Sequence, residues 1–301
     1  MKTIFVPLQV ILIIMISPLV TGVIAKVKNN LRMKIGASIF QPYYNIFKLF
    51  CKEVIIPGNS SWIFRFAPYA ALASSVAAAS IIIPLAPAGF RSFSGDLFAL
   101  LFIFALGRFF TALAGLDAGS SFGGMGASRE MFIGALAEPA ALLSLFAVSM
   151  SNGSTVPIPS SISIAHYSPV IAGFALFIVM LAETSRIPID NRETHLELTM
   201  IHEAMVLEYS GRNLALIEIA SHIKQLVFLT LIANTALPRI GFMSGAAPSI
   251  GFYVVKVLAL AGVVAIIEVS TAKIRLFRAA DLLAFGFVLS SIAVIVSAMG
   301  M

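Results

Sequence analysis

Long apolar runs constrain what this chain can fold into more than any other feature. A membrane-spanning helix needs about 20 mostly apolar residues. Eight such runs occur, at about residues 3–25, 66–88, 95–116, 131–150, 169–186, 217–237, 250–272 and 280–299. The strands of a membrane barrel would be about ten residues long, with alternating polarity. The sequence therefore predicts an all-α, polytopic membrane protein whose residues 1–301 form a single membrane domain.

The composition also places this chain in lipid. Hydrophobic residues make up 59% of the sequence and charged residues 11%, whereas soluble domains have about 45–50% and about 25%. A soluble protein of this size has too little interior to hide so much apolar surface. These values exclude a soluble enzyme, a disordered chain and a secreted disulfide scaffold. The single cysteine, Cys51, excludes an intrachain disulfide and an iron–sulfur cluster held by four thiolates of this chain.

The basic residues predict the orientation. The connections after the first, third, fifth and seventh runs contain Lys26, Lys28, Arg32, Lys34, Lys48, Lys52, Arg65, Arg129, Arg186, Arg192, Arg212, Lys273, Arg275 and Arg278. The other face holds Arg91 and Arg239, with Lys2 at the N-terminus. Basic residues accumulate on the cytoplasmic side of a membrane. We therefore expect these connections in the cytoplasm and both termini on the opposite, outer side of the inner membrane. The net charge of +6 thus reflects orientation, and no basic stripe with interleaved aromatic residues indicates nucleic acid.

The first run has one property of a secretory signal peptide, because Lys2 precedes it. However, Lys26 and Lys28 follow the run at once, and no clear A-x-A cleavage site is present. We therefore expect a retained anchor.

The connection at residues 26–65 contains an amphipathic pattern. Its apolar residues recur at helical spacing: Ile39, Phe40, Tyr43, Ile46, Phe47 and Phe50. Lys48 and Lys52 accompany them, as in an amphipathic helix that lies in the membrane interface on the cytoplasmic side. Two interpretations stay open: an ordinary connecting helix, and one wall of a lateral opening into the membrane.

Ionisable residues inside apolar runs are energetically expensive and usually face a bundle interior or a water-filled path. Glu138 lies in the fourth run, directly before Pro139, which removes a backbone donor. Because Glu138 has no cationic neighbour in sequence, a functional role is predicted for it. Glu218, His222 and Gln225 lie at i, i+4 and i+7 in the sixth run and share one helix face.

Other charged residues of the apolar runs allow two interpretations. A candidate secondary relay comprises Glu218, His222, Lys224, Lys256 and Glu268. Lys256, Glu268 and Asp281 can instead lie near a membrane face, where they would snorkel or pair locally. His222 can be a packing histidine rather than a proton carrier. Arg108, in the third run, is expected to neutralise a nearby carboxylate.

The connection at residues 182–216 is the densest group of ionisable residues. Its acids and histidines are Glu183, Asp190, Glu193, His195, Glu197, His202, Glu203 and Glu208. If the stretch is helical, Asp190, Glu193 and Glu197 lie at i, i+3 and i+7, where like charges repel one another. Partial burial of such a group favours the uptake and release of protons. A solvated acidic loop is the alternative, but apolar residues interleave the acids throughout.

The histidines of this connection do not form a recognised metal motif. His202 and Glu203 begin an H-E-x-x-H pattern, but Val206 occupies the place of the second histidine. His195 and His202 are seven residues apart and can share a helical face, which leaves metal binding as a minor alternative. We expect no metal in this chain.

A glycine-rich connection follows the third run. The sequence GLDAGSSFGGMGASRE at residues 115–130 lacks the Lys-Ser/Thr ending of a phosphate-binding P-loop. Close packing against a partner, or a tight turn beneath one, fits the glycines better. Asp117, Arg129 and Glu130 add charges on this cytoplasmic face and are predicted to lie at a partner interface.

Several of these stretches carry a family resemblance. AETSRIPIDNRETHLEL at residues 182–198, followed by LEYSG at 207–211, resembles the signature of the subunit 1 family of respiratory complex I. That family has eight spans and an outside N-terminus. Within it, GRFFTALAGLDAGSSFGGMGASRE at 107–130 and QPYYNIFKLF at 41–50 are similar to the membrane subunit of group 4 NiFe hydrogenases, of the hydrogenase-4 and formate hydrogenlyase type.

The resemblance implies roles for individual residues. Asp190, Glu193, Glu197 and Glu208 match the acids of the family's cytoplasmic-side chamber. Glu138 matches a glutamate within the membrane that begins a lateral proton path. With the signature arginine, the candidate proton path and chamber comprises Glu138, Glu183, Arg186, Asp190, Glu193, His195, Glu197 and Glu208.

The sequence departs from the complex I pattern at three places. His195 stands where complex I subunits carry an acid, although a histidine can still pass protons near neutral pH. Ile189 stands where phenylalanine is usual. A longer stretch near residues 32–41, which helps to shape the quinone chamber, is absent, and this disfavours a quinone-reducing role.

The function that the resemblance implies is a membrane-anchoring, ion-translocation-coupling subunit of a hydrogen-evolving NiFe hydrogenase or formate hydrogenlyase-like complex. The NiFe centre and 4Fe–4S clusters are expected on the peripheral large and small hydrogenase subunits, and no cofactor on this chain. The acidic chamber would pass protonation changes to antiporter-like membrane subunits.

Two alternatives belong to other functional classes. The first is a quinone-binding membrane subunit of a complex I-like NADH dehydrogenase, with quinone as its ligand. The second is a free-standing secondary transporter, suggested by the intramembrane acids and by the helix break at Glu138–Pro139. The lack of a visible internal repeat disfavours the transporter.

Overall fold

The computed structural model describes residues 2–82, 96–153, 167–190, 200–236 and 246–299. Every regular element within these ranges is an α-helix. The helices are α1 (Lys2–Leu31), α2 (Gln41–Phe50), α3 (Trp62–Ile81), α4 (Leu97–Asp117), α5 (Ser121–Asn152), α6 (Ser168–Glu183), α7 (His202–Val206), α8 (Gly211–Thr235), α9 (Ala246–Ser270) and α10 (Leu276–Ala298). The predicted all-α fold class is confirmed.

Six helices in the described part of the chain are long and apolar enough to cross a membrane: α1, α4, α5, α8, α9 and α10. The eight-span prediction differs from this count at two helices. Helix α6 matches the predicted run at 169–186 but has only 16 residues in the described range. Helix α3 has 20 residues, but Arg65, Pro68 and several serines make it more polar. A polytopic membrane protein is confirmed, and six of the eight predicted spans meet both criteria within the described residues.

The fourth predicted run, 131–150, is only part of a longer helix, because α5 begins at Ser121. Most of the glycine-rich stretch is therefore helical. A Cβ atom at Gly126 would lie 2.9 Å from the carbonyl oxygen of Ile201, so glycine permits close packing of α5 against the start of α7. At Gly126 the close packing is thus with the chain itself rather than with a partner. The tight turn before α5 uses Gly119, whose φ is 67°.

Helix α2 confirms the amphipathic element predicted in the connection at 26–65. None of its residues is buried, and Tyr44, Phe47 and Phe50 are exposed. Its inner side packs against α1 and α8, where the Tyr43 hydroxyl donates a hydrogen bond to the Met15 carbonyl. The helix therefore presents an apolar face outward, as expected of an element in the membrane interface.

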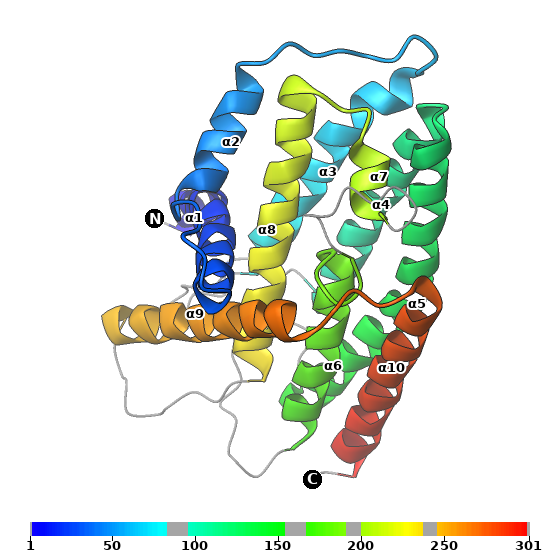
Figure 1. Ribbon diagram of the computed structural model, residues 1–301. Helices are drawn as coiled ribbons and strands as arrows, with labels where there is room; N and C mark the ends of the chain where they lie inside the picture. The colour runs from blue at the N-terminus through cyan, green and yellow to red at the C-terminus, as the bar shows by residue number, and fades with distance from the viewer. Residues whose placement is uncertain (1, 83–95, 154–166, 191–199, 237–245, 300–301) are drawn as a thin grey trace.

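The spanning helices pack around one principal core. Figure 1 shows α5, α6, α8 and α10 running in broadly similar directions, while α9 lies across α8. Helix α5 packs against α4, α6 and α10, and α8 packs against α3 and α6. In the core, the rings of Phe104 on α4 and Phe228 on α8 stack with centroids 5.4 Å apart. This packing brings polar residues of α4, α5, α6 and α8 to one place.

Candidate functional site

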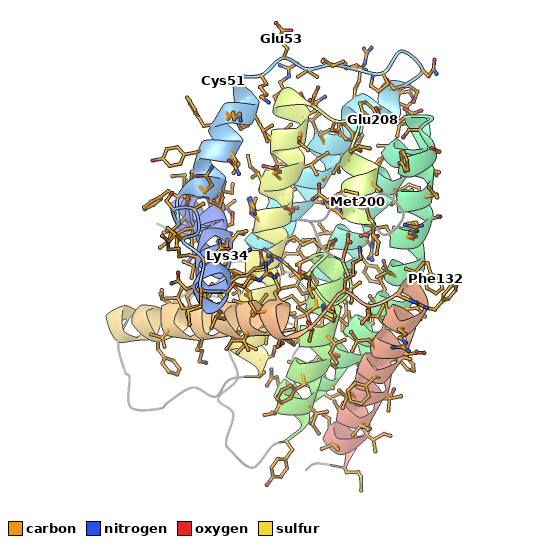
Figure 2. The ribbon with its side chains drawn as sticks, in the orientation of Figure 1. Lys34, Cys51, Glu53, Phe132, Met200 and Glu208 are labelled. Atoms are coloured by element: carbon orange, nitrogen blue, oxygen red, sulfur yellow. The ribbon has the colours of Figure 1, made fainter. Side chains whose placement is uncertain are left out.

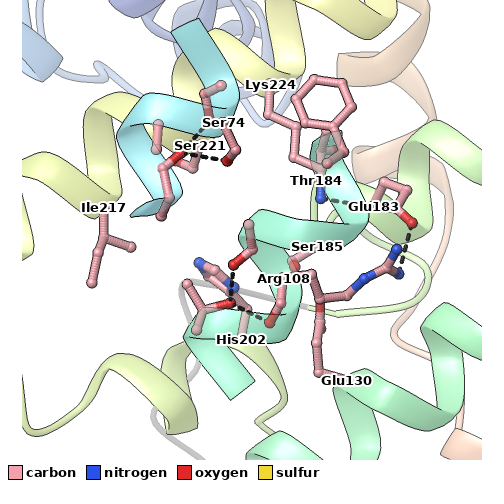
Figure 3. Close-up of a pocket in the computed structure, with 16 residues that line it drawn as sticks. Ser74, Arg108, Glu130, Glu183, Thr184, Ser185, His202, Ile217, Ser221 and Lys224 are labelled. Atoms are coloured by element: carbon pink, nitrogen blue, oxygen red, sulfur yellow. Dashed lines mark hydrogen bonds and ion pairs between the residues drawn. The ribbon is translucent and has the colours of Figure 1, made fainter. Parts of the chain in front are cut away.

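A pocket of about 60 Å³, lined by both polar and apolar side chains, lies where α3, α4, α5, α6 and α8 meet (Figure 3). Its ionisable lining residues are Arg108, Glu130, Glu183, His202 and Lys224. Hydroxyl groups of Ser74, Ser75, Thr111, Thr184, Ser185 and Ser221 complete the polar lining. Such hydroxyls can bind water in an otherwise apolar bundle. We call this space the central pocket.

One buried cation joins three helices beside the central pocket. The Arg108 guanidinium on α4 lies 2.8 Å from Glu183 at the end of α6 and also pairs with Glu138 on α5. The ammonium of Lys224 on α8 lies 2.6 Å from the other oxygen of Glu183. The Arg108 and Glu183 side chains are only 6% and 5% exposed. The expectation that Arg108 neutralises a carboxylate is confirmed.

The sequence makes room for this cation through small residues. A Cβ atom at Gly134 on α5 would lie 2.4 Å from a guanidinium nitrogen of Arg108. A Cβ atom at Gly107 would lie 2.3 Å from the Ser74 hydroxyl. The ammonium of Lys224 lies 5.6 Å from the ring centroid of Phe104, within the range of a cation–π contact.

Glu130 belongs to the central pocket, although the sequence placed it at a partner interface. Its residue is 6% exposed and lines the pocket. Helix α5 already begins at Ser121, so Glu130 is a helical residue. It lies among the buried residues of that helix. Among the described side chains, this group contains three carboxylates (Glu130, Glu138 and Glu183) and two cations (Arg108 and Lys224).

A second polar network joins α1, α8 and α9 through the signature arginine. Glu268 on α9 lies 3.0 Å from Lys28 on α1 and 2.9 Å from Arg186. Arg186 also donates to the amide oxygen of Gln225 on α8, at 2.7 Å. The Glu268 side chain is 2% exposed. Two cations therefore enclose one buried carboxylate.

The predicted shared face on α8 joins this second network. The Thr21 hydroxyl of α1 lies 3.0 Å from a ring nitrogen of His222 and 3.2 Å from the amide oxygen of Gln225. This confirms that His222 and Gln225 face the same neighbour. The His222 ring thus contacts a hydroxyl between two helices, which both a packing histidine and a proton carrier would do.

Asp190, the last described residue before the gap at 191–199, anchors the signature stretch. Its carboxylate lies 2.7 Å from the Lys273 ammonium and accepts hydrogen bonds from the backbone amides of Ile201 and His202. The backbone amide of Ile274 donates to the Pro188 carbonyl at 3.0 Å. Asp190 is 2% exposed. The signature stretch is therefore tied to the α9–α10 connection and to the start of α7.

Three predicted chamber residues, Glu193, His195 and Glu197, lie outside the described residues. Glu208 is partly buried and lies apart from the central pocket, toward the end of the molecule that carries Cys51 (Figure 2). The described members of the predicted chamber therefore do not form one cluster. Glu183 joins Arg108, whereas Arg186 joins the second network.

The remaining relay candidates are spread over several helices. Lys256 donates to the Ala233 carbonyl near the end of α8 and lies 4.8 Å from the ring centroid of Phe252. Glu218 lies partly buried on α8. Among the secondary relay candidates, Lys224 belongs to the central pocket and Glu268 to the second network.

The two other residues predicted at a partner interface make contacts within the chain. The Asp117 carboxylate accepts the backbone amides of Ser61 and Phe64 at 2.7 and 3.3 Å and thereby caps the start of α3. Arg129 donates to the Met200 carbonyl at 3.1 Å. Both side chains are partly exposed, so each also has surface that is free for contact with a partner subunit.

The sequence analysis did not predict the buried ion pairs that Lys28 and Lys273 form. Both were assigned only to membrane orientation, because each lies beside a predicted span. Each forms an ion pair with a buried carboxylate from a distant helix or connection. No local spacing signals such a pair. No group of three or more metal-ligating side chains occurs among the described residues.

Comparison with known proteins shows similarity over nearly the whole chain. The family model described as NADH dehydrogenase matches residues 3–299. Hydrogenase-4 component C of Escherichia coli is 36% identical over 248 residues, which are 78% of this chain and 75% of that protein. Formate hydrogenlyase subunit 4 of Escherichia coli is 30% identical over 288 residues, which are 92% of each chain.

More distant similarity extends to other respiratory complexes. A subunit of the NADH-quinone oxidoreductase of Rubrobacter xylanophilus is 29% identical over 265 residues, which are 81% of this chain and 75% of that protein. A chain in the solved structure of the membrane-bound sulfane sulfur reductase, an archaeal respiratory membrane complex, gives a TM-score of 0.84 at 20% identity. The match covers 98% of this chain and 99% of that one, and it shows a shared fold.

Proposed function

This chain belongs to the NADH dehydrogenase subunit 1 family, and on that basis we propose that it couples ion translocation to hydrogen evolution. It would be the membrane-anchoring subunit of a NiFe hydrogenase or formate hydrogenlyase-like complex in the inner membrane, with both termini outside. Its peripheral partners would be hydrogenase large and small subunits that hold the NiFe centre and 4Fe–4S clusters. Its membrane partners would be antiporter-like subunits.

The observation that carries the proposal is the ion-pair system of Arg108. This guanidinium contacts Glu183 beside the central pocket and Glu138 within α5. If Glu183 took up a proton, its attraction to Arg108 would weaken. Arg108 would then pair more strongly with Glu138. Buried charges respond in this way because unneutralised charge is costly in a low-dielectric interior.

The stoichiometry of the group supports proton transfer. When the three carboxylates, Arg108 and Lys224 are all ionised and His202, which also lines the pocket, is neutral, the group carries one more negative than positive charge. Burial of that excess charge favours uptake of one proton by the group. The hydroxyl-lined central pocket provides polar partners for the water that would deliver it. Glu130, Glu183 and Glu138 would be the groups that accept and release the proton.

Replacement of Glu138 by glutamine tests the proposal. We expect Glu138→Gln to keep the complex assembled and evolving hydrogen while hydrogen-linked proton uptake into inverted membrane vesicles falls at least tenfold. Glutamine keeps the size and one hydrogen-bond acceptor but cannot release a proton at neutral pH. Asp281→Asn, which neutralises an exposed carboxylate on α10, is the matched control and should pump normally. Wild-type proton uptake in Glu138→Gln would contradict the proposal.

A quinone-binding role is the second candidate, favoured by the similarity to a subunit of NADH-quinone oxidoreductase. Under it, the connection at 182–216 and the segment around α2 would line a quinone tunnel. The purified complex distinguishes the two. Hydrogen evolution without added quinone supports the first, whereas quinone-dependent electron transfer that is lost on replacing Arg186 supports the second. A gene neighbour that encodes a large subunit with two C-x-x-C nickel motifs also favours the first.

A further inference from the structure

An open hollow of about 590 Å³ lies at the start of α3, outside the central pocket and the second network. It is lined by Ser60, Ser61, Trp62, Arg65, Phe66 and Tyr69. Figure 1 shows the connection from α2 entering α3 at the end of the molecule where α8 begins. The basic residues of the connection at 26–65 predict that this end is cytoplasmic. We call this surface the α3 hollow.

One face of α3 carries the aromatic side chains of the hollow together with a cation. Trp62, Phe66 and Tyr69 lie at i, i+4 and i+7 and are 68%, 44% and 49% exposed. Arg65 lies at i+3 on the same face and is also exposed. Tryptophan and tyrosine are enriched at the level of the lipid headgroups, because one end of each ring system is apolar and the other is polar. The face therefore has the composition of a lipid-contacting surface at the membrane interface.

The aromatic surface continues from α3 onto α4. The ring of Phe66 meets the ring of Phe110 edge-on, with centroids 5.3 Å apart, and Phe110 meets Phe109 with centroids 5.8 Å apart. Phe109 is exposed as well. Phe110 lies seven residues before the end of α4 at Asp117, which is about 10 Å along the helix. Because Asp117 caps the start of α3, these rings lie deeper than Arg65, where an acyl chain would follow its headgroup.

The cation of the hollow is not neutralised within the described part of the chain. Arg65 makes no ion pair or hydrogen bond with any described residue. The carboxylate of Asp117 instead accepts the backbone amides of Ser61 and Phe64. The Ser61 hydroxyl accepts from the amide of Ile63 at 3.2 Å, and its own proton has no acceptor among the described residues. A guanidinium beside a free hydroxyl donor is a combination that suits a phosphate group.

We propose that the α3 hollow binds an anionic phospholipid, whose phosphate pairs with Arg65 and whose acyl chain lies along the rings of Phe66 and Phe109. A planar guanidinium can donate two parallel hydrogen bonds to a phosphate. Trp62 and Tyr69 would flank the headgroup. A zwitterionic lipid fits less well, because its ammonium group would face the same guanidinium. The site is independent of the proposed coupling, since none of its residues lines the central pocket.

Trp62 makes the site directly observable, because it is the one tryptophan of the sequence. The full chain is placed in phosphatidylcholine nanodiscs that contain a minor fraction of lipid with brominated acyl chains, which quench tryptophan fluorescence at short range. We expect brominated phosphatidylglycerol to quench Trp62 at least twofold more strongly than brominated phosphatidylcholine at the same mole fraction. Arg65→Gln should abolish this difference, whereas Arg65→Lys should keep part of it.

The matched control is Arg278→Gln, which removes an exposed cation of α10 instead. This variant should keep the wild-type preference for phosphatidylglycerol. Equal quenching by the two lipids in the wild type, or a preference that persists in Arg65→Gln, would overturn the proposal. A preference that Arg65→Gln and Arg278→Gln reduce equally would also overturn it, because the net charge of the chain rather than the hollow would then attract the lipid.

A second measurement uses the intact complex and distinguishes a lipid from a protein occupant. A photoreactive phenylalanine analogue is placed at Phe66, and the same analogue at Phe285, exposed on α10, provides the comparison position. Adducts at Phe66 should be phospholipids with a larger share of anionic headgroups than those at Phe285, and Arg65→Gln should make the two shares equal. A protein adduct at Phe66, which would mean that a partner subunit covers the hollow, would contradict the proposal. Equal anionic shares at both positions of the otherwise unchanged chain would contradict it as well.

Discussion

The guanidinium of Arg108 on α4 lies 2.8 Å from the carboxylate of Glu183 on α6, and both side chains are buried. Because Arg108 also pairs with Glu138, a single cation connects the central pocket with the outer part of α5. Removing one partner of a buried ion pair leaves the other charge uncompensated, which costs about 3–5 kcal/mol. This relationship is therefore important for stability and for the proposed coupling.

Replacement of Arg108 should affect both properties. Arg108→Gln leaves Glu183 with Lys224 alone, so the free energy of unfolding should fall by about 3–5 kcal/mol. Proton uptake coupled to hydrogen evolution should also be lost. Thermal unfolding in detergent and vesicle acidification measure the two effects. Arg278→Gln, at an exposed position of α10, is the control. Unchanged stability in Arg108→Gln would contradict the role of this ion pair.

Gly134 should be required for the position of Arg108. Gly134→Ala places a methyl group 2.4 Å from the guanidinium, and we expect a loss of about 1–3 kcal/mol in stability with impaired coupling. Gly124→Ala on the same helix is the matched control, because its nearest neighbour, Leu116, is 3.9 Å away. The control should be neutral or slightly stabilising. Equal behaviour of the two variants would show that the space beside Arg108 is not limiting.

The second network should hold α9 against α1. Glu268→Gln removes the carboxylate that pairs with both Lys28 and Arg186, so the repulsion between these two cations would increase. We expect the free energy of unfolding to fall by about 3–5 kcal/mol and amide exchange to accelerate in both helices. Hydrogen–deuterium exchange of the purified complex measures this, with exposed Glu53→Gln as the control. Wild-type protection of α9 in Glu268→Gln would refute the prediction.

The hydroxyl of Tyr209 should fix the start of α3. It donates to the Phe64 carbonyl at 2.8 Å, and the two rings stack with centroids 4.1 Å apart. Tyr209→Phe keeps the stacking but removes the donor, which should cost about 1 kcal/mol. Thermal unfolding at neutral pH measures this loss. A loss several times larger would indicate that the hydroxyl has an additional role.

The same residue predicts a pH dependence. Burial, and secondarily the charge of Asp117, raises the pKa of Tyr209 above its ordinary value of 10.0. The folded state therefore holds the phenolic proton that the unfolded chain releases above pH 10, so stability is full below that pH and falls as the pH rises further. The unfolding temperature of the wild type should decline more steeply above pH 10 than that of Tyr209→Phe. Parallel declines would exclude this contribution.

The sequence was sufficient for local features. Runs of about 20 apolar residues predict spanning helices because lipid leaves backbone groups to be satisfied within a helix. The amphipathic period predicts α2, and the spacing of His222 and Gln225 predicts their common face, because both follow from 3.6 residues per turn. The third apolar run likewise indicated that Arg108 needs a carboxylate.

The identity of each ion-pair partner was decided by tertiary structure alone. Arg108 meets a glutamate 30 residues away, and Lys273 meets an aspartate 83 residues away. Helix periodicity determines which residues share a face, but not which helix that face will meet. That choice depends on the crossing of whole helices and on small residues such as Gly134, whose missing side chain leaves the space that the guanidinium occupies. The sequence therefore determined a membrane protein with a few costly charges, and packing determined which of those charges neutralise one another.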